Sequence, residues 1–139
     1  MNSMFSINRP LFLLTVLFAA FAADSAGAQQ LIFPDSVCNI GEIAENDPPR
    51  TYRFRYENRS DKPIVILRVD TSCGCVKSSF SRKPIAPRAT GEVVITFDPH
   101  GREGALYKQM PVYTSASGNR PAIRLALSGT VKPARRTEQ

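Results

Sequence analysis

The sequence predicts an antiparallel β-sandwich, and three observations support this prediction. Beyond residue 28, apolar and polar residues alternate at every second position in one run after another. The runs are separated by Pro, Gly and Asn, and none of them shows an apolar stripe with helical spacing. About seven such runs in about 100 residues, without helices between them, are typical of two antiparallel sheets packed face to face.

Residues 1–28 are predicted to be a secretory signal peptide and are excluded from this fold. Arg9 supplies a positive charge, the apolar run Leu11–Ala23 follows, and Ala26 and Ala28 fit the small residues of a cleavage site. The apolar run is shorter than a membrane span, which needs roughly 20 residues. We therefore expect export to the periplasm or the extracellular space, with cleavage after Ala28 and no stable membrane span afterwards.

The mature chain is expected to form one domain, residues 29–131, followed by a flexible basic tail, residues 132–139. The chain has 18 Lys and Arg against 12 Asp and Glu, which gives a net charge of +6. An exported protein rarely meets nucleic acid, so no nucleic-acid partner is expected. We interpret the charge as a solvated basic surface or as attraction to an anionic partner.

The first strands follow one another from the start of the mature chain. Residues 31–43 predict one or two short strands, interrupted by Pro34 and Gly41. Residues 52–56 alternate aromatic and arginine side chains, which places the aromatic rings in the core and the arginines in water. The turn "NRSDKP" follows, and the next strand is expected at residues 64–70.

The second half of the domain continues this pattern after a long interruption. Residues 71–87 contain two prolines and are predicted to be mostly loop. Alternation then predicts strands at residues 92–99, 105–115 and 122–131. Pro111 lies inside one of these strands, and because it has no amide hydrogen it requires an edge position or a bulge.

Several motifs stand in a fixed order: "NRSDKPIVILRVDTSCGC", then "KPIAP", "GEVVITFDP" and "LALSGTV". With Asn-x-x-x-x-Pro before a strand, Ser-Cys-Gly-Cys at its end and a closing Gly-x-Val strand, the chain resembles the bacterial Domain of Unknown Function 1573 family over about Leu31–Val131. More distantly, it is similar to the immunoglobulin-like domains of the major sperm protein and ciliary type. The resemblance implies an exported immunoglobulin-like antiparallel β-sandwich of about seven strands and no assigned catalytic activity.

Three positions depart from the usual pattern of this family. Val76 stands where Thr usually follows the second cysteine, and Arg88 stands after Pro87, where Gly is usual. Ile40 stands before Gly41, where an aromatic residue is usual. We expect these departures to change the detail of loops and to leave the fold unchanged.

The motif Ser72–Cys75 contains two of the three cysteines, and exported proteins keep disulfides. In a fully extended chain the Cα atoms of Cys73 and Cys75 would be roughly 6.6–7.2 Å apart, whereas a disulfide prefers roughly 4.4–6.8 Å. Gly74 can shorten this distance by adopting a turn, which would join the two cysteines in a small ring. The alternative is a disulfide from one of them to Cys38, which otherwise acts as a small buried hydrophobe.

Further roles stay open for this motif. The thiols can be free and merely structural. A thiolate pair suits Cu(I) or zinc, but a closed zinc site needs four ligands and the chain adds only Cys38 and His100. Redox enzymes usually carry Cys-x-x-Cys at a helix start, whereas this Cys-x-Cys ends a strand. The alternative function is therefore a periplasmic thiol-redox or copper- or zinc-handling protein that uses Cys73 and Cys75.

The sequence contains no G-x-S-x-G elbow, no phosphate-binding glycine loop and no H-E-x-x-H, and its carboxylates form no catalytic pair at readable spacing. We expect neither an enzyme nor a cofactor. The main hypothesis is a non-enzymatic binding or scaffolding module of the bacterial cell envelope, with a protein or another envelope component as partner. The contact surface is expected to be an exposed strand edge or the loop Thr71–Pro87. In this loop Phe80, Arg82 and Lys83 are the candidate contact residues, because an aromatic ring among charges can anchor a partner unless it folds back onto the core.

Overall fold

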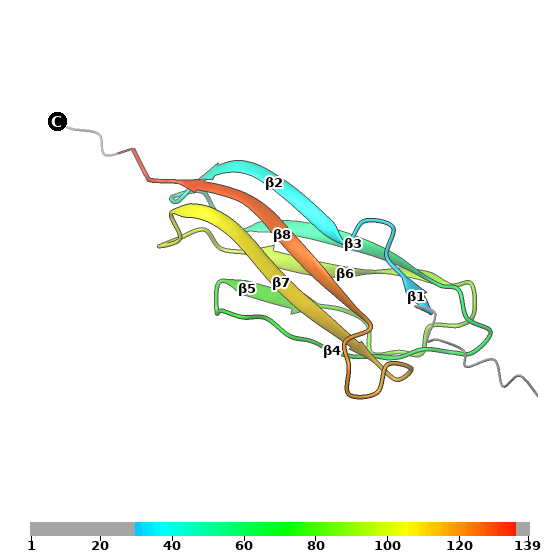
Figure 1. The fold of residues 1–139 in the computed structure, drawn as a ribbon. Coiled ribbons are helices and arrows are strands. Elements are labelled where there is room, and N and C mark those ends of the chain that lie inside the picture. Colours follow the sequence, from blue (N-terminus) through cyan, green and yellow to red (C-terminus); the bar gives the residue numbers. More distant parts are fainter. Residues whose placement is uncertain (1–29, 136–139) are drawn as a thin grey trace, which may run out of the picture.

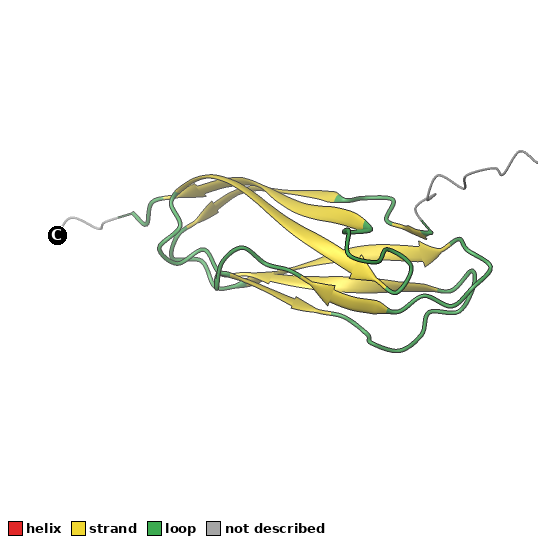
Figure 2. Ribbon diagram, turned by 60° about the horizontal axis from the view of Figure 1, so that its bottom comes forward, coloured by secondary structure: helices red, strands yellow, loops and turns green. Residues whose placement is uncertain are grey.

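The computed structural model describes residues 30–135, which form two four-stranded sheets packed face to face (Figures 1 and 2). One sheet has the order β1-β3-β6-β5 and the other the order β2-β8-β7-β4. The strands are β1 Leu31–Ile32, β2 Val37–Ala44, β3 Arg50–Asn58, β4 Ile66–Val69, β5 Val76–Ser79, β6 Thr90–Phe97, β7 Gly104–Thr114 and β8 Ile123–Lys132. The predicted signal peptide, residues 1–28, and the last four residues of the predicted tail lie outside the described residues.

The prediction of an all-β sandwich is confirmed, but the number of strands needs a correction. Residues 30–135 form eight strands, because β5 lies within residues 71–87, which were predicted to be mostly loop. The β5 sequence "VKSS" carries little strand propensity of its own. It becomes a strand because it pairs with β6 and buries Val76 in the core.

A second correction concerns the direction of one strand pair. β2 and β8 run parallel, whereas the sequence predicted antiparallel pairing throughout. A parallel pair needs a long crossover connection, and here most of the domain separates the two strands. After β1 the chain leaves its first sheet near Pro34, and β2 then begins beside β8 in the other sheet.

The core lies between the sheets and contains the residues that the alternation directs inward. Phe54 and Tyr56 are buried while Arg53 and Arg55 are exposed, which confirms the predicted faces of β3, although Tyr52 is only half-buried. Both sheets contribute the largest fully buried side chains. These include Phe54, Phe97, Ile64, Ile66, Ile95, Met110, Leu125 and Leu127.

β7 has a partner on both sides over only part of its length. β8 pairs with residues 104–112, whereas β4 pairs only with residues 112–114. The Asp70 amide donates to the Pro111 carbonyl at 2.9 Å, but Pro111 has no amide hydrogen to donate in return. β4 therefore leaves the sheet here, in agreement with the edge position expected for Pro111. Gly104–Met110 is left with a free side, which we call the open edge of β7.

The turns gather at the two ends of the sandwich (Figure 1). One end carries the turns at residues 45–49, 70–75 and 98–103. The Asp98 amide donates to the Cys75 carbonyl at 2.8 Å, and the Gly101 amide donates to a Glu45 carboxylate oxygen at 3.1 Å, so these three turns touch. The opposite end carries the loops after β3, β5 and β7. Within residues 30–135, no helix has the length and apolar character needed to cross a membrane.

Candidate functional site: the Cys-Gly-Cys turn and the open edge of β7

The Cys-Gly-Cys motif forms the turn between β4 and β5. The Val76 amide donates to the Cys73 carbonyl at 3.3 Å, which closes a four-residue turn. Cys73 and Cys75 are joined in a disulfide, with their Cα atoms 5.3 Å apart. The turn therefore brings the pair into the range of roughly 4.4–6.8 Å that disulfides adopt.

The turn does not use the special conformational freedom of glycine. Gly74 is absent from the residues with positive φ in the described chain, and a Cβ atom added there would meet nothing within 4 Å. The turn that shortens the distance between the two cysteines therefore has backbone angles that residues other than glycine also adopt. Gly74 and Ser72 are both exposed, so this side of the motif faces water.

The two sulfur-bearing side chains differ in burial. Cys75 is 6% exposed and belongs to the core, whereas Cys73 is half-buried and packs against that core from outside. The disulfide therefore fixes an exposed turn onto the end of the sandwich. A reagent from solution would reach Cys73 more readily than Cys75.

Cys38 is a free cysteine and is not part of this disulfide. It lies on β2, half-buried against the core. Burial raises the pKa of the Cys38 thiol, and the nearby Asp35 carboxylate raises it further. Tyr52 lies close to this thiol, and burial likewise raises the pKa of its hydroxyl, which has no hydrogen-bond partner within residues 30–135.

The residues of the described chain do not assemble a metal centre around the motif. No three His, Cys, Asp or Glu side chains within residues 30–135 lie close enough together to hold an ion. Nδ1 of His100 instead lies 2.6 Å from an Asp98 carboxylate oxygen, and this hydrogen bond lowers the pKa of Asp98. Asp70 accepts a hydrogen bond from Nε of Arg68 at 3.1 Å, and the guanidinium of Arg68 lies 3.6 Å from the centre of the Tyr113 ring.

The predicted contact residues Phe80, Arg82 and Lys83 follow β5. Phe80 is half-buried and packs against the core. Its ring therefore holds the loop onto the sandwich, and only part of it is exposed to a partner. The guanidinium of Arg82 lies 5.4 Å from the centre of this ring, and its Nη1 donates to the Leu67 carbonyl at 3.1 Å. Lys83 is exposed.

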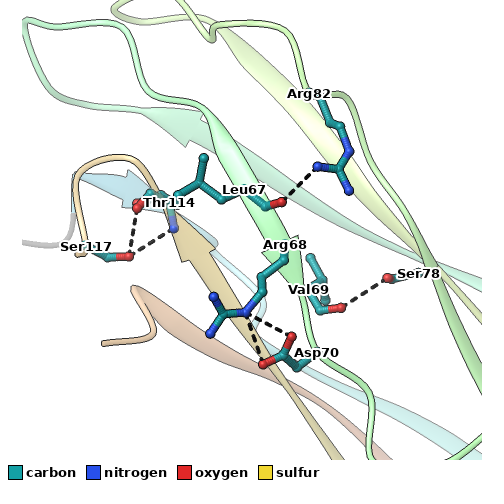
Figure 3. A network of polar contacts seen from close by, with 8 residues as sticks. All are labelled: Leu67, Arg68, Val69, Asp70, Ser78, Arg82, Thr114 and Ser117. Atoms are coloured by element: carbon teal, nitrogen blue, oxygen red, sulfur yellow. Dashed lines mark hydrogen bonds and ion pairs between the residues drawn. The ribbon is translucent and has the colours of Figure 1, made fainter. Parts of the chain in front are cut away.

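The outer edge of β4 is closed by two side chains, Ser78 on β5 and Arg82 in the loop after β5 (Figure 3). Arg82 occupies the carbonyl of Leu67, and the Ser78 hydroxyl donates to the carbonyl of Val69 at 3.4 Å. Two acceptors that an incoming strand would need are therefore already in use. This is a common way of protecting a sheet edge from unwanted pairing.

The open edge of β7 lacks this protection. An exposed strand edge was expected as a possible contact surface, but the sequence did not indicate which strand would supply it. Alternate residues of a strand direct their backbone groups to opposite sides. The Pro111 carbonyl and the Ser115 amide both bond toward the β4 side, each at 2.9 Å. By this alternation, Ala105, Tyr107 and Gln109 direct their amides and carbonyls toward the open edge. All three are exposed, and Tyr107 is 60% exposed. Pro111 was the one sequence signal for this edge.

The two packed sheets form an immunoglobulin-like sandwich, and the Cys-Gly-Cys motif forms one of its turns. The sequence profile of the family "Protein of unknown function (DUF1573)" matches residues 31–131, so the chain belongs to this family. The predicted resemblance is thus confirmed, and so is the immunoglobulin-like fold. No curated protein matches the chain.

Solved structures of low sequence identity share the fold. A protein of unknown function from Porphyromonas gingivalis W83 has a TM-score of 0.60 and 11% identity, over 72% of this chain and 46% of that one. The PapD-like domain 7 of human CEP192 has a TM-score of 0.60 and 13% identity, over 78% of this chain and 89% of that one. WR4, a major sperm protein family member of C. elegans, has a TM-score of 0.50 and 6% identity, over 73% and 97%.

Proposed function

We propose that this protein is a non-enzymatic binding module of the bacterial cell envelope, exported and then joined by a protein partner at the open edge of β7. The observation behind the proposal is a contrast between two stretches of the same sheet edge, one formed by β4 and the other by residues 104–110 of β7. Leu67 and Val69 on β4 have carbonyls occupied by side chains. Ala105, Tyr107 and Gln109 on β7 present amides and carbonyls to solvent.

An extended peptide suits this edge because strand addition takes its affinity from backbone hydrogen bonds. Three residues of β7 each supply one amide and one carbonyl, and the exposed ring of Tyr107 adds contact area beside them. Lys108 is half-exposed at the middle of the edge, where a like charge would oppose pairing with a second copy of β7. The partner strand is therefore expected to carry a carboxylate opposite Lys108.

The proposal is tested by photo-crosslinking in the cell envelope. A photoreactive phenylalanine derivative replaces Tyr107 in one protein and Arg124 in the control, which lies on the same sheet away from the edge. We expect one partner to be crosslinked at position 107 and not at position 124. Gln109→Pro should abolish this adduct, because it removes an amide that faces the open edge.

Gln109→Pro is a suitable variant because β7 already contains Pro111. Residues 109 and 111 direct their backbone groups to the same side of the strand, so a proline at 109 would lose an amide hydrogen on that side only. The purified partner should also slow amide hydrogen exchange at Tyr107 and Gln109. Equal crosslinking at both positions, or an adduct that survives Gln109→Pro, would contradict strand addition at this edge.

A second candidate function, thiol–disulfide exchange, is favoured by the unequal burial of Cys73 and Cys75. A thiolate of a partner dithiol would attack the more accessible Cys73 sulfur, form a mixed disulfide and release the Cys75 thiolate. The second partner thiolate would then release Cys73, leaving both cysteines reduced and the partner oxidised. A Cys73→Ser, Cys75→Ser variant that keeps the Tyr107 adduct separates this function from the binding function.

A further inference from the structure

The loops at residues 59–65, 80–89 and 115–122, with Gln30, form what we call the basic end of the sandwich. These loops contain six cations and one carboxylate, Asp61, a surplus of five positive charges. All six cations are exposed: Arg59, Lys62, Arg82, Lys83, Arg88 and Arg120. These few loops thus carry nearly as much net positive charge as the whole chain, whose net charge is +6.

The opposite end of the sandwich has no such positive surplus, although Lys132 and Arg135 lie beside its carboxylates. The turns at residues 45–49, 70–75 and 98–103 contain five carboxylates and one cation, Arg102. The carboxylates are Glu45, Asp47, Asp70, Asp98 and Glu103. The positive surplus of the basic end therefore favours an end-on approach of the molecule to an anionic surface.

The basic end is a fixed platform, because hydrogen bonds tie its loops together. Ile64 and Ile85 exchange backbone hydrogen bonds of 3.0 and 2.7 Å between the first two loops. Val65 and Ser115 exchange bonds of 2.9 and 3.0 Å between the first and the third. The buried side chain of Asn58 lies beneath the first two loops and bonds to both.

The positive charges of this platform are available to an external anion. Within residues 30–135, Arg59 is the one cation of the six in an ion pair, with Glu57 at 3.3 Å. The side chains of Lys62, Lys83 and Arg120 make no hydrogen bond to other described residues.

The basic end is also the end at which the described chain begins. The Arg59 amide donates to the Gln30 carbonyl at 2.8 Å, which places Gln30 beside the first basic loop. The apolar run Leu11–Ala23 ends only a few residues earlier in the sequence. The predicted signal peptide, which would bring the chain to a membrane for export, therefore joins the domain at its basic end.

We propose that the basic end binds the anionic headgroups of this membrane. An anionic lipid surface spreads its charge over a plane, which matches cations distributed over three adjoining loops, and each Lys or Arg near it strengthens binding about fivefold. End-on binding directs the open edge of β7, which lies toward the opposite end of the sandwich, away from the lipid. The inference does not depend on the binding function proposed for β7.

The test measures binding to vesicles of phosphatidylglycerol mixed with phosphatidylcholine, and to phosphatidylcholine alone. The variant Lys62→Glu, Lys83→Glu, Arg120→Glu changes the basic end. Its matched control, Arg55→Glu, Arg102→Glu, Arg124→Glu, makes the same net-charge change at exposed positions elsewhere. All proteins are purified after export with the same N-terminus. We expect the first variant to lose at least about 100-fold in affinity for the anionic vesicles, and the control to lose less than about tenfold.

Several outcomes would overturn the inference. Equal losses in the two variants would show that net charge alone drives binding. Unchanged binding by the first variant, or no binding of the unaltered protein to anionic vesicles at low salt, would do so as well. Binding to polyglutamate without binding to vesicles would assign the platform to acidic polypeptides. If the first variant is unfolded by circular dichroism, Lys62→Gln, Lys83→Gln, Arg120→Gln replaces it, with an expected loss of at least about tenfold.

Discussion

The side-chain amide of Asn58 donates a hydrogen bond of 2.8 Å to the backbone carbonyl of Ile85, across 27 positions of sequence. The same nitrogen donates to the Lys62 carbonyl at 2.8 Å, and the side-chain oxygen accepts from the amide and hydroxyl of Ser60 at 3.0 and 2.7 Å. Asn58 is fully buried, its bond to Ile85 is buried, and the other three bonds are partly buried. The Asn-x-x-x-x-Pro motif thus closes its own turn and holds the loop after β5.

Asn58→Ala is expected to destabilise the fold strongly. It removes four hydrogen bonds and leaves the buried carbonyl of Ile85 without its side-chain donor, which corresponds to about 2–4 kcal/mol. Urea unfolding measures the change. Asn119→Ala, at an exposed position, is the control and should stay within about 0.5 kcal/mol. A loss at Asn58 no larger than that of the control would show that the network contributes nothing to stability.

Arg88 adopts a left-handed backbone conformation, with φ at 66°, at the position where the family usually has glycine. This conformation is less stable for an L-residue by roughly 1–2 kcal/mol. We therefore expect Arg88→Gly to be more stable than Arg88→Ala by about 1 kcal/mol, measured by urea unfolding. Both variants lose the hydrogen bond from Nη1 of Arg88 to the Arg59 carbonyl, so their difference isolates the backbone. Equal stability would argue against strain at this position.

The alternation of side chains was sufficient to predict the sandwich and the inward faces of its long strands, because a period of two separates Phe54 from its arginine neighbours whatever the partner strand is. It could not predict β5, since the burial of Val76 depends on pairing with β6. It could not predict the parallel β2–β8 pair either, because the direction of pairing is decided by where the chain changes sheets. Ile85 could not be recognised as a partner of Asn58, because nothing local marks it.

The candidate site was less predictable than the fold. The spacing of Cys73 and Cys75 limits which disulfides are geometrically possible. It does not choose among them, because it is the turn between β4 and β5 that brings the two Cα atoms to 5.3 Å. The polar residues around Phe80 suggested that its ring could be an exposed anchor. In the structure the ring is partly buried and packs against the core. The open edge of β7 depends on where β4 stops, and a strand's own sequence does not show how much of it is covered by a neighbour.

Two glycines should respond in opposite ways to the same substitution. A Cβ atom at Gly129 would lie 2.5 Å from Cγ1 of Ile40 and 2.6 Å from the Gly41 carbonyl oxygen, at the bulge of β2. Gly129→Ala should therefore cost about 1–3 kcal/mol in the free energy of unfolding. Gly74→Ala meets open space and should gain about 0.5 kcal/mol, because alanine restricts the unfolded chain.

Urea unfolding and intact mass measure this pair of variants. The mass should show that Gly74→Ala still forms the disulfide between Cys73 and Cys75. A loss of that disulfide would mean that the turn needs a conformation open only to glycine. A neutral Gly129→Ala would mean that the bulge of β2 can move away from β8.

Alkylation distinguishes the three cysteines by mass. In denaturant without reductant, iodoacetamide should add to one cysteine, Cys38, and after reduction it should add to all three. In the native protein the pKa of Cys38 is raised by burial and by Asp35, so less thiolate is present at pH 8 and its alkylation should be slower than in denaturant. Asp35→Asn should speed up the native reaction, because it removes a negative charge that opposes the thiolate.

Each pattern of adducts has a distinct meaning. Three adducts without reductant would show that Cys73 and Cys75 are free thiols in the exported protein. No adduct without reductant would place Cys38 in a bond to another molecule. A single adduct located on Cys73 or Cys75 by peptide mapping would show that the other of the two is bonded to Cys38, and the turn would then need a different account.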